Sequence, residues 1–170
     1  MAAGVLGDPR FGTAGEPAAR LARRIVLTVP ALLLAGAYVS QYGFGLYPCE
    51  MCWWQRYAHF ATLALGVLAL LRPRTRALSW LAALALLFAG LLGGYHAGVE
   101  YHWWQGFTAC TAVASHGGNA LDAILNAPMI RCDTAQWTLL GISLAGYNFL
   151  ISTAAALVSL WLLGRAGRPA

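Results

Sequence analysis

Four long apolar stretches constrain the fold of this chain more than any other feature of its sequence. They run roughly over residues 25–44, 52–71, 77–96 and 138–163, and each is close to the ~20 residues that a helix needs to cross a bilayer. The chain is 59% hydrophobic and 10% charged, whereas about a quarter of the residues in soluble domains are charged. Because lipid offers no partner to backbone polar groups, each stretch has to be helical. The sequence therefore predicts an all-α membrane protein in which residues 21–165 form a bundle of four transmembrane helices.

The positive charges predict how this bundle is oriented. All of the eleven basic residues are arginines, and nine of them precede the first stretch, separate the second from the third, or follow the fourth: Arg10, Arg20, Arg23, Arg24, Arg72, Arg74, Arg76, Arg165 and Arg168. Because positive charge accumulates on the cytoplasmic side of membrane proteins, both termini are expected in the cytoplasm. The arginines form no basic face interleaved with aromatic residues, so we expect no nucleic-acid partner despite the net charge of +5.

The N-terminal segment differs in character from the rest of the chain. Residues 1–20 are rich in Ala and Gly and have no apolar period, which predicts a disordered cytoplasmic tail. The arginines that follow would also suit a signal peptide. The apolar run after them is too long for one, however, and no clear cleavage site precedes Cys49. We therefore expect the first stretch to remain in the protein as a membrane span.

The four cysteines all fall on the side opposite the arginines. Cys49 and Cys52 lie in the first outer loop, and Cys110 and Cys132 lie in the second, over about residues 97–137. An even number of cysteines facing an oxidising compartment permits two disulfides. Between the second pair, the segment 117–128 begins with a Gly-Gly turn and repeats its apolar residues at helical spacing, which predicts a short interfacial helix. Tryptophans are expected to line the same interface: Trp53, Trp54, Trp103, Trp104 and Trp137.

The Cys-x-x-Cys pair has the sequence context of a reactive site. Pro48 stops any helix before it, and the apolar run begins directly after it, so Cys52 is expected in the first turn of the second helix. Free N–H groups and the helix dipole there favour a thiolate. Arg56 is four residues further on, which places its charge on the same helix face. The alternative for Arg56 is a side chain that only snorkels to the lipid headgroups. The alternatives for the cysteine pair are a structural disulfide and a zinc site. The last lacks the usual second close pair of ligands, so no metal is expected.

The remaining chemistry is thiol–disulfide exchange, which needs an electron acceptor. The sequence contains no haem, flavin or iron–sulfur signature. A membrane protein is surrounded by the lipid-soluble quinone pool, and a dithiol at the membrane boundary can meet a quinone head group. Arg56 would then stabilise the negative charge that develops on a quinone oxygen. The expected electron acceptor is therefore a membrane quinone.

Three segments resemble a known family. "GLYPCEMCWWQR" resembles the Pro-Cys-x-x-Cys-x-x-[Gln/Glu]-Arg motif of the DsbB family, the bacterial disulfide bond formation protein B. "YHAGVEYHWWQGFTAC" and "RCDTAQWTLLGISLAGYN" are similar to the segments around the family's third and fourth cysteines. The resemblance covers roughly residues 25–163. It implies a multi-pass protein of the bacterial inner membrane, with its cysteine loops in the periplasm. It also implies an enzyme that reoxidises DsbA, a periplasmic thioredoxin-fold dithiol oxidase, and passes the electrons to ubiquinone or menaquinone.

The resemblance also implies a role for each site residue. Cys110 would form the mixed disulfide with DsbA, and Cys132 would be its partner and exchange with Cys49. Cys52 would face the quinone as a thiolate. Arg56 and His96 would bind the quinone oxygens. Two other polar residues of the apolar runs were expected to make contacts between helices: His59 and Asn148.

Two alternatives and one departure from the family pattern accompany this prediction. A quinone reductase like vitamin K epoxide reductase also uses four cysteines in a helix bundle, but there the Cys-x-x-Cys follows the separated pair. A non-enzymatic membrane protein with two structural disulfides is the second alternative. Phe107 stands where the family commonly has a proline before the third cysteine, so the loop that receives the partner is expected to differ in shape.

Overall fold

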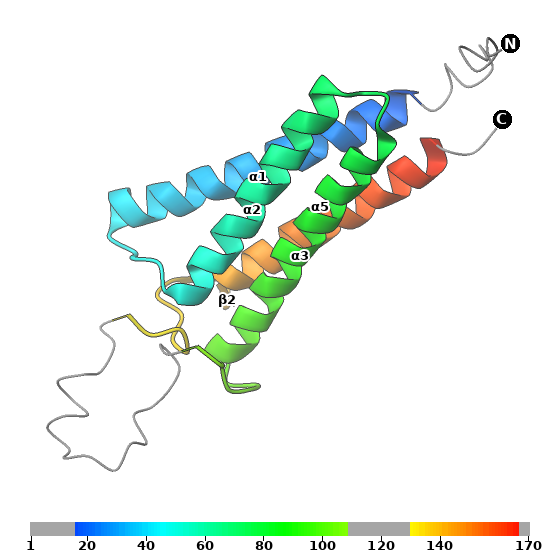
Figure 1. Cartoon of the computed structure of the whole chain (residues 1–170). Coiled ribbons are helices and arrows are strands. Elements are labelled where there is room, and N and C mark those ends of the chain that lie inside the picture. Colours follow the sequence, from blue (N-terminus) through cyan, green and yellow to red (C-terminus); the bar gives the residue numbers. More distant parts are fainter. Residues whose placement is uncertain (1–15, 109–129, 167–170) are drawn as a thin grey trace, which may run out of the picture.

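Four long helices make up most of the described chain. The computed structural model describes residues 16–108 and 130–166. Over these residues the helices are α1 (Glu16–Phe44), α2 (Glu50–Leu71), α3 (Arg76–Glu100) and α5 (Leu144–Ala166), and two short strands, β1 (Thr138–Leu139) and β2 (Ile142–Ser143), precede α5. Figure 1 shows the helices running along one another as a bundle. The sequence-based prediction of an all-α bundle is confirmed for the described residues.

Three of the described helices have the length and hydropathy to cross a membrane. They are α1 over Pro17–Phe44, α3 and α5. The fourth, α2, is less apolar because its first half carries polar side chains that the bundle buries: Gln55, Arg56, His59 and Thr62. The chain is thus a multi-pass membrane protein with three candidate spans, and α2 packs against α1 and α3.

The arginine-rich end and the cysteine-bearing end of the bundle are opposite each other. The start of α1, the turn between α2 and α3 and the end of α5 lie together at one end, and the loop before α2 lies at the other (Figure 1). At the first end Arg23 donates hydrogen bonds to Pro73 O at 3.0 Å and to Ser79 Oγ at 3.3 Å. Arg76 donates to the carbonyl of Ala166. These arginines therefore also tie the turn and the last helix together.

The start of the fourth apolar stretch was predicted wrongly. Residues 138–143, expected to be helical, form an antiparallel hairpin in which Thr138 pairs with Ser143 and Leu139 with Ile142. Leu140 and Gly141 make the turn with φ values of 51° and 78°, and two successive positive φ values are what a type I′ hairpin requires. Ser143 then caps the helix, since its Oγ accepts a hydrogen bond from Gly146 N at 3.1 Å.

Apart from the start of α1, the other helix boundaries lie within about four residues of the predicted ones. The helix α1 begins at Glu16, so residues 16–20 are helical and not part of a disordered tail, and Pro30 lies inside the helix without ending it. The helices α2 and α3 extend the predicted spans by a few residues at their ends. Residues 1–15 and the predicted interfacial helix over 117–128 lie outside the described residues.

The closest helix packing in the described bundle is between α3 and α5, and it depends on small residues. A Cβ on Gly93 would lie 2.9 Å from Phe149 N and 3.0 Å from Ala145 O. Both are backbone atoms, which cannot move aside as a side chain can. Close approach at glycine is a common way for membrane helices to associate, because it increases van der Waals contact in the absence of a hydrophobic driving force.

We therefore expect Gly93→Ala to lower the melting temperature of the detergent-solubilised protein, by an amount equivalent to about 1–3 kcal/mol of overpacking. Gly164→Ala is the matched control on α5, since a Cβ there meets nothing within 4 Å. Thermal unfolding followed by circular dichroism checks both variants. Equal melting temperatures for Gly93→Ala and Gly164→Ala would contradict the close α3–α5 contact.

Candidate redox site

The Cys-x-x-Cys pair lies where a loop turns into α2. The chain leaves α1 at Phe44, and Gly45 has a φ of 70°, which suits glycine. Cys49 is the N-cap residue of α2, so its Sγ accepts a hydrogen bond from Cys52 N at 3.4 Å. Cys52 lies in the first helical turn, as predicted. Both cysteines are free thiols, and Cys52 Sγ lies 3.2 Å from Cys49 Sγ.

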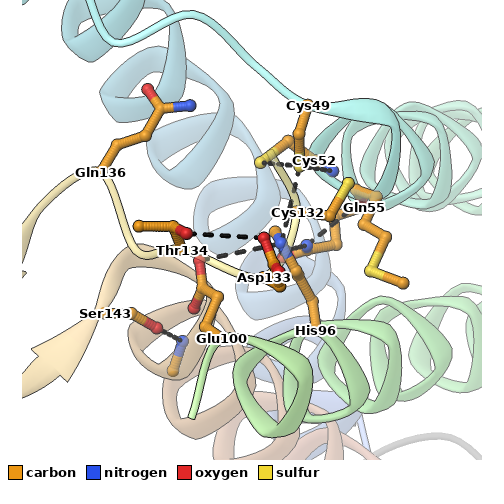
Figure 2. A network of polar contacts seen from close by, with 12 residues as sticks. Cys49, Cys52, Gln55, His96, Glu100, Cys132, Asp133, Thr134, Gln136 and Ser143 are labelled. Atoms are coloured by element: carbon orange, nitrogen blue, oxygen red, sulfur yellow. Dashed lines mark hydrogen bonds and ion pairs between the residues drawn. The ribbon is translucent and has the colours of Figure 1, made fainter. Parts of the chain in front are cut away.

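Hydrogen-bond donors converge on Cys49. The Cys52 thiol, the Cys52 amide and His96 Nε2, the last at 3.5 Å, all surround its Sγ (Figure 2). The contact with the Cys52 thiol has the largest effect, and with the help of His96 it lowers the pKa of Cys49 well below its ordinary value, although burial opposes the shift. The sequence predicted the thiolate at Cys52, whereas in this state the structure directs the stabilising donors to Cys49.

Cys132 lies beside Cys49 although 83 positions separate the two in the sequence. Cys49 Sγ, a ring nitrogen of His96 and Cys132 Sγ all lie within 4.8 Å of one another. Cys132 is fully buried and disulfide-bonded, and Thr108 Oγ1 contacts its Sγ at 3.7 Å. Gln136 Nε2 donates to Tyr47 O at 2.7 Å, which ties the loop that carries Cys132 to the loop that carries Cys49. The fold therefore brings the third described cysteine to the reactive pair.

Cys49, His96 and Cys132 are of residue types that bind metal ions, although the sequence predicted no metal site. The sulfur of Cys132 is engaged in a disulfide, and zinc binds the thiolate form of cysteine. While Cys132 is in a disulfide, the arrangement of Cys49, His96 and Cys132 therefore favours thiol–disulfide exchange over metal binding. The expectation that no metal is needed stays a prediction.

A cavity of about 250 Å³ opens on the other side of the pair. Cys52 lines it together with Arg56, and most of the remaining lining is apolar. The residues that line it come from α1, the loop before α2, α2 itself, Gln136 and α5: Leu32, Leu33, Leu34, Gly36, Ala37, Ser40, Leu46, Tyr47, Pro48, Cys52, Gln55, Arg56, His59, Gln136, Leu144, Tyr147 and Asn148. An apolar cavity with a few polar groups is typical of a small-molecule site.

Arg56 is buried in the wall of this cavity. It is 5% exposed, and its guanidinium donates to Gln41 Oε1 at 2.6 Å and to Ala37 O at 3.1 Å. The guanidinium also lies over the rings of Tyr38 and Trp53, at 4.7 Å and 5.0 Å from their centroids. This arrangement disfavours the snorkelling alternative, since a snorkelling arginine keeps its head group in water.

His96 does not line the cavity, although the sequence predicted that it would bind the same ligand as Arg56. Its Nε2 lies 3.5 Å from Cys49 Sγ and 3.7 Å from Glu100 Oε1, and its Nδ1 lies 2.9 Å from Gln55 Nε2. Figure 2 shows His96 below the cysteines, between Gln55 and Glu100. The structure thus gives His96 the sulfur of Cys49 as a neighbour.

A chain of buried polar side chains, which the sequence predicted only in part, links His96 to the cavity. Asn148 Nδ2 donates to Gln55 Oε1 at 2.7 Å, and Asn148 Oδ1 lies 2.9 Å from His59 Nε2. The helix contact expected for His59 and Asn148 is confirmed. The signal that could have drawn attention to Gln55 and His59 is their spacing, since with Cys52 they recur at three or four residues along one face of α2.

When Cys49 and Cys52 are reduced and Cys132 is still in its disulfide, we expect Cys49 to be a thiolate at neutral pH, because its pKa is lowered from the ordinary cysteine value of 9.0. A lowered pKa keeps the thiolate as the pH falls below the ordinary value, and the thiolate is lost only when the pH falls through the lowered one. The ultraviolet absorbance of the thiolate, followed during a pH titration, measures the pKa of Cys49. The Cys49→Ser variant should lack the absorbance that persists at low pH. An absorbance that rises only near the ordinary pKa would contradict the proposed stabilisation of Cys49.

Comparison with known proteins places this geometry in a family. The family model for "Disulfide bond formation protein DsbB" matches residues 19–162. The chain belongs to the DsbB family. A DsbB-family relative named disulfide bond formation protein B, from Azoarcus sp. (strain BH72), is 36% identical over 149 residues, covering 78% of this chain and 84% of the relative. Another of that name, from Paracidovorax citrulli (strain AAC00-1), is 33% identical over 164 residues, covering 87% and 90%. No solved structure gives a significant match.

Membership of the DsbB family implies thiol oxidoreductase activity in disulfide bond formation. Three of the described helices are candidate membrane spans. Membership of the family adds that such a multi-pass protein lies in the inner membrane. Three of the four cysteines that the sequence assigned to the site lie in the described part of the structure, and they lie together. Cys110 lies outside the described residues.

Proposed function

We propose that this protein oxidises a periplasmic DsbA-like dithiol protein and passes the electrons to a membrane quinone, ubiquinone or menaquinone. The observation that carries the proposal is the position of Cys49. Its Sγ lies within 4.8 Å of Cys132 Sγ on one side and 3.2 Å from Cys52 Sγ on the other, and Cys52 lines the cavity that contains Arg56. A path for two electrons from the outer loop to the cavity therefore needs no large movement of the described residues.

The first exchange takes place at the outer disulfide, which we propose joins Cys110 and Cys132. A thiolate of the reduced partner attacks Cys110, forms a mixed disulfide and releases Cys132 as a thiolate. Thr108 Oγ1, 3.7 Å from Cys132 Sγ, donates to the sulfur that leaves. The second thiol of the partner then resolves the mixed disulfide, so the partner is oxidised and two electrons remain on Cys110 and Cys132.

The second exchange carries these electrons to the Cys-x-x-Cys pair. The Cys132 thiolate attacks Cys49 of the oxidised pair, which breaks the bond to Cys52 and releases Cys52 as a thiolate facing the cavity. Cys110 then attacks Cys132, restores the outer disulfide and releases Cys49. The donors around Cys49, the Cys52 amide and His96 Nε2, stabilise the negative charge on its sulfur at this step.

The residues of the cavity fit a quinone head group. Its walls are mostly apolar, Cys52 presents a sulfur and Arg56 a guanidinium. A bound quinone would supply the acceptor for two electrons and two protons, which returns Cys49 and Cys52 to the disulfide. Arg56 would hold a quinone oxygen by a charge-assisted hydrogen bond, and the apolar walls of α1 and α5 would exclude water.

We further propose that α2 is the fourth membrane span and that both termini are cytoplasmic. Except for Arg56 and Arg131, the described arginines gather at the end of the bundle where α1 begins and α5 ends, and the described cysteines lie at the opposite end (Figure 1). The positive-inside rule then directs the cysteine loops to the periplasm. This is the compartment in which a DsbA-like partner works.

One reaction tests the proposed function. The purified protein is mixed with a reduced thioredoxin-fold dithiol oxidase and a soluble short-chain quinone, and quinone absorbance is followed. We expect catalytic loss of the absorbance, which Cys110→Ser abolishes. Turnover of neither ubiquinone nor menaquinone analogues would contradict the proposal and favour a protein with structural disulfides.

A further inference from the structure

His59 is one of four residues of α2 that line the cavity, and it has no role in the proposed transfer. Cys52, Arg56 and His59 recur at four and three residues, which places them on one face of the helix. His59 is 3% exposed, and its Nδ1 is buried without a hydrogen-bond partner among the described residues. A buried nitrogen without a partner is costly, so a ligand that satisfies it would gain affinity.

The neighbours of His59 determine what its Nδ1 can do. Asn148 Nδ2 lies 3.2 Å from the carbonyl oxygen of Ala89 and 2.7 Å from Gln55 Oε1. A carbonyl oxygen only accepts, so the amide nitrogen of Asn148 must face it, and Asn148 Oδ1 must face His59 Nε2 at 2.9 Å. The proton of the neutral ring is therefore on Nε2, and Nδ1 is a bare acceptor.

A bare acceptor on a residue that lines this cavity would distinguish the two redox forms of a quinone, once a head group displaces the atoms that cover the nitrogen. The oxidised form presents only carbonyl oxygens, which cannot donate a hydrogen bond to His59. The reduced form presents hydroxyl groups, which can. We propose that His59 Nδ1 accepts a hydrogen bond from a hydroxyl group of the hydroquinone, so that the cavity binds the reduced head group through His59 as well as Arg56.

The position of His59 suits the far side of one ring. His59 follows Arg56 by three residues on α2, which is about 4.5 Å along the helix axis and comparable to the width of a single six-membered ring. One oxygen of a head group beside Cys52 can thus approach Arg56 while the other approaches His59. This assignment rests on the proposed function, because it takes the cavity to be the quinone site.

The decisive measurement is equilibrium binding to the purified protein without turnover. A short-chain hydroquinone, kept reduced under anaerobic conditions, and the corresponding quinone are titrated separately, and binding is followed by tryptophan fluorescence. His59→Phe keeps a ring but removes the acceptor. We expect the Kd of the hydroquinone to rise about tenfold, the effect of one lost hydrogen bond, while the Kd of the quinone changes little.

Two further variants separate this effect from a general disturbance of packing. Thr62→Val is the matched control, since Thr62 is buried one turn further along α2, bonds to Ala58 O within its own helix, and does not line the cavity. It should bind both forms as the wild type does. His59→Gln retains an acceptor and should bind the hydroquinone more tightly than His59→Phe.

A spectroscopic readout tests the tautomer directly. The chain has only four histidines, so ¹⁵N-histidine labelling gives few resonances. We expect an unprotonated Nδ1 at His59 that shifts when hydroquinone is added and stays in place when quinone is added. A proton on Nδ1, or an equal loss of affinity for both forms in His59→Phe, would overturn the inference. If the inference about His59 failed in this way while the wild type still turned over quinone, the proposed function would stand. Absence of wild-type turnover would remove both the proposed function and the inference about His59.

Discussion

Cys49→Ser is expected to abolish catalytic quinone reduction, with a loss of at least about a thousandfold, the scale seen when a covalent catalytic residue is removed. Among the described cysteines, Cys49 alone lies between the other two, within 4.8 Å of Cys132 Sγ and 3.2 Å from Cys52 Sγ. Without its sulfur, electrons that reach Cys132 cannot pass to Cys52. The variant should still accept one pair of electrons from the reduced partner, because the outer disulfide remains. Stopped-flow measurement of quinone absorbance, with partner oxidation measured in parallel, checks both expectations.

Cys52→Ser is the matched variant, since it removes the other sulfur of the same pair. It is expected to lose quinone reduction as well. It should accumulate a disulfide between Cys49 and Cys132, because the Cys49 thiolate keeps its donors and can attack Cys132 of the outer disulfide, which releases Cys110 as a thiolate. Non-reducing peptide mass analysis distinguishes the two variants. If Cys52→Ser formed no such disulfide, or if Cys49→Ser still turned over, the proposed order of exchange would be wrong.

Arg56→Met is expected to raise the quinone KM by about 10- to 100-fold, which corresponds to a lost charge-assisted hydrogen bond. Methionine retains much of the apolar stem of Arg56 and loses the guanidinium. The KM for the dithiol partner should not change, since Arg56 lies in the cavity wall and not in the outer loop. Steady-state kinetics with each substrate varied in turn measures the two constants.

Gln41→Leu provides the control for this variant. It removes the acceptor that lies 2.6 Å from Arg56 Nη1 but keeps the guanidinium, so a smaller increase in the quinone KM is expected. Melting temperatures of both variants establish whether the bundle remains folded. An unchanged quinone KM in a folded Arg56→Met protein would mean that Arg56 supports the helix contact with α1 and nothing more.

Most of the bundle could be predicted because lipid leaves the backbone few choices. The apolar length of the runs and the position of the arginines located most helix ends to within a few residues. The exceptions are the start of α1, which lies nine residues before the predicted one, and the start of α5. There the mean hydropathy of residues 138–143 concealed a turn that depends on the positive φ of two residues, Leu140 and Gly141. Hydropathy averages over a window, whereas a two-residue turn is decided by local conformation.

The candidate site was predictable in its residue types and less so in its contacts. Spacing along α2 placed Cys52 and Arg56 on one face, and the cavity contains both. The placement of His96 beside Cys49, and of Cys132 beside both, depends on how separate helices and loops pack. No spacing within one segment carries that information. The direction of the donors to Cys49 likewise follows from its N-cap geometry, which becomes visible only when the helix start is known to the residue.

The polar first half of α2 has a consequence for how the chain enters the membrane. Taken alone, this helix would carry the charge of Arg56 into hydrocarbon without partners, which is costly. The partners that satisfy the guanidinium, Gln41 and Ala37 O, both belong to α1. The first two helices therefore form the smallest unit in which this charge is accommodated. If α2 is the fourth span, as we propose, we expect it to become stable in the bilayer only when it is paired with α1.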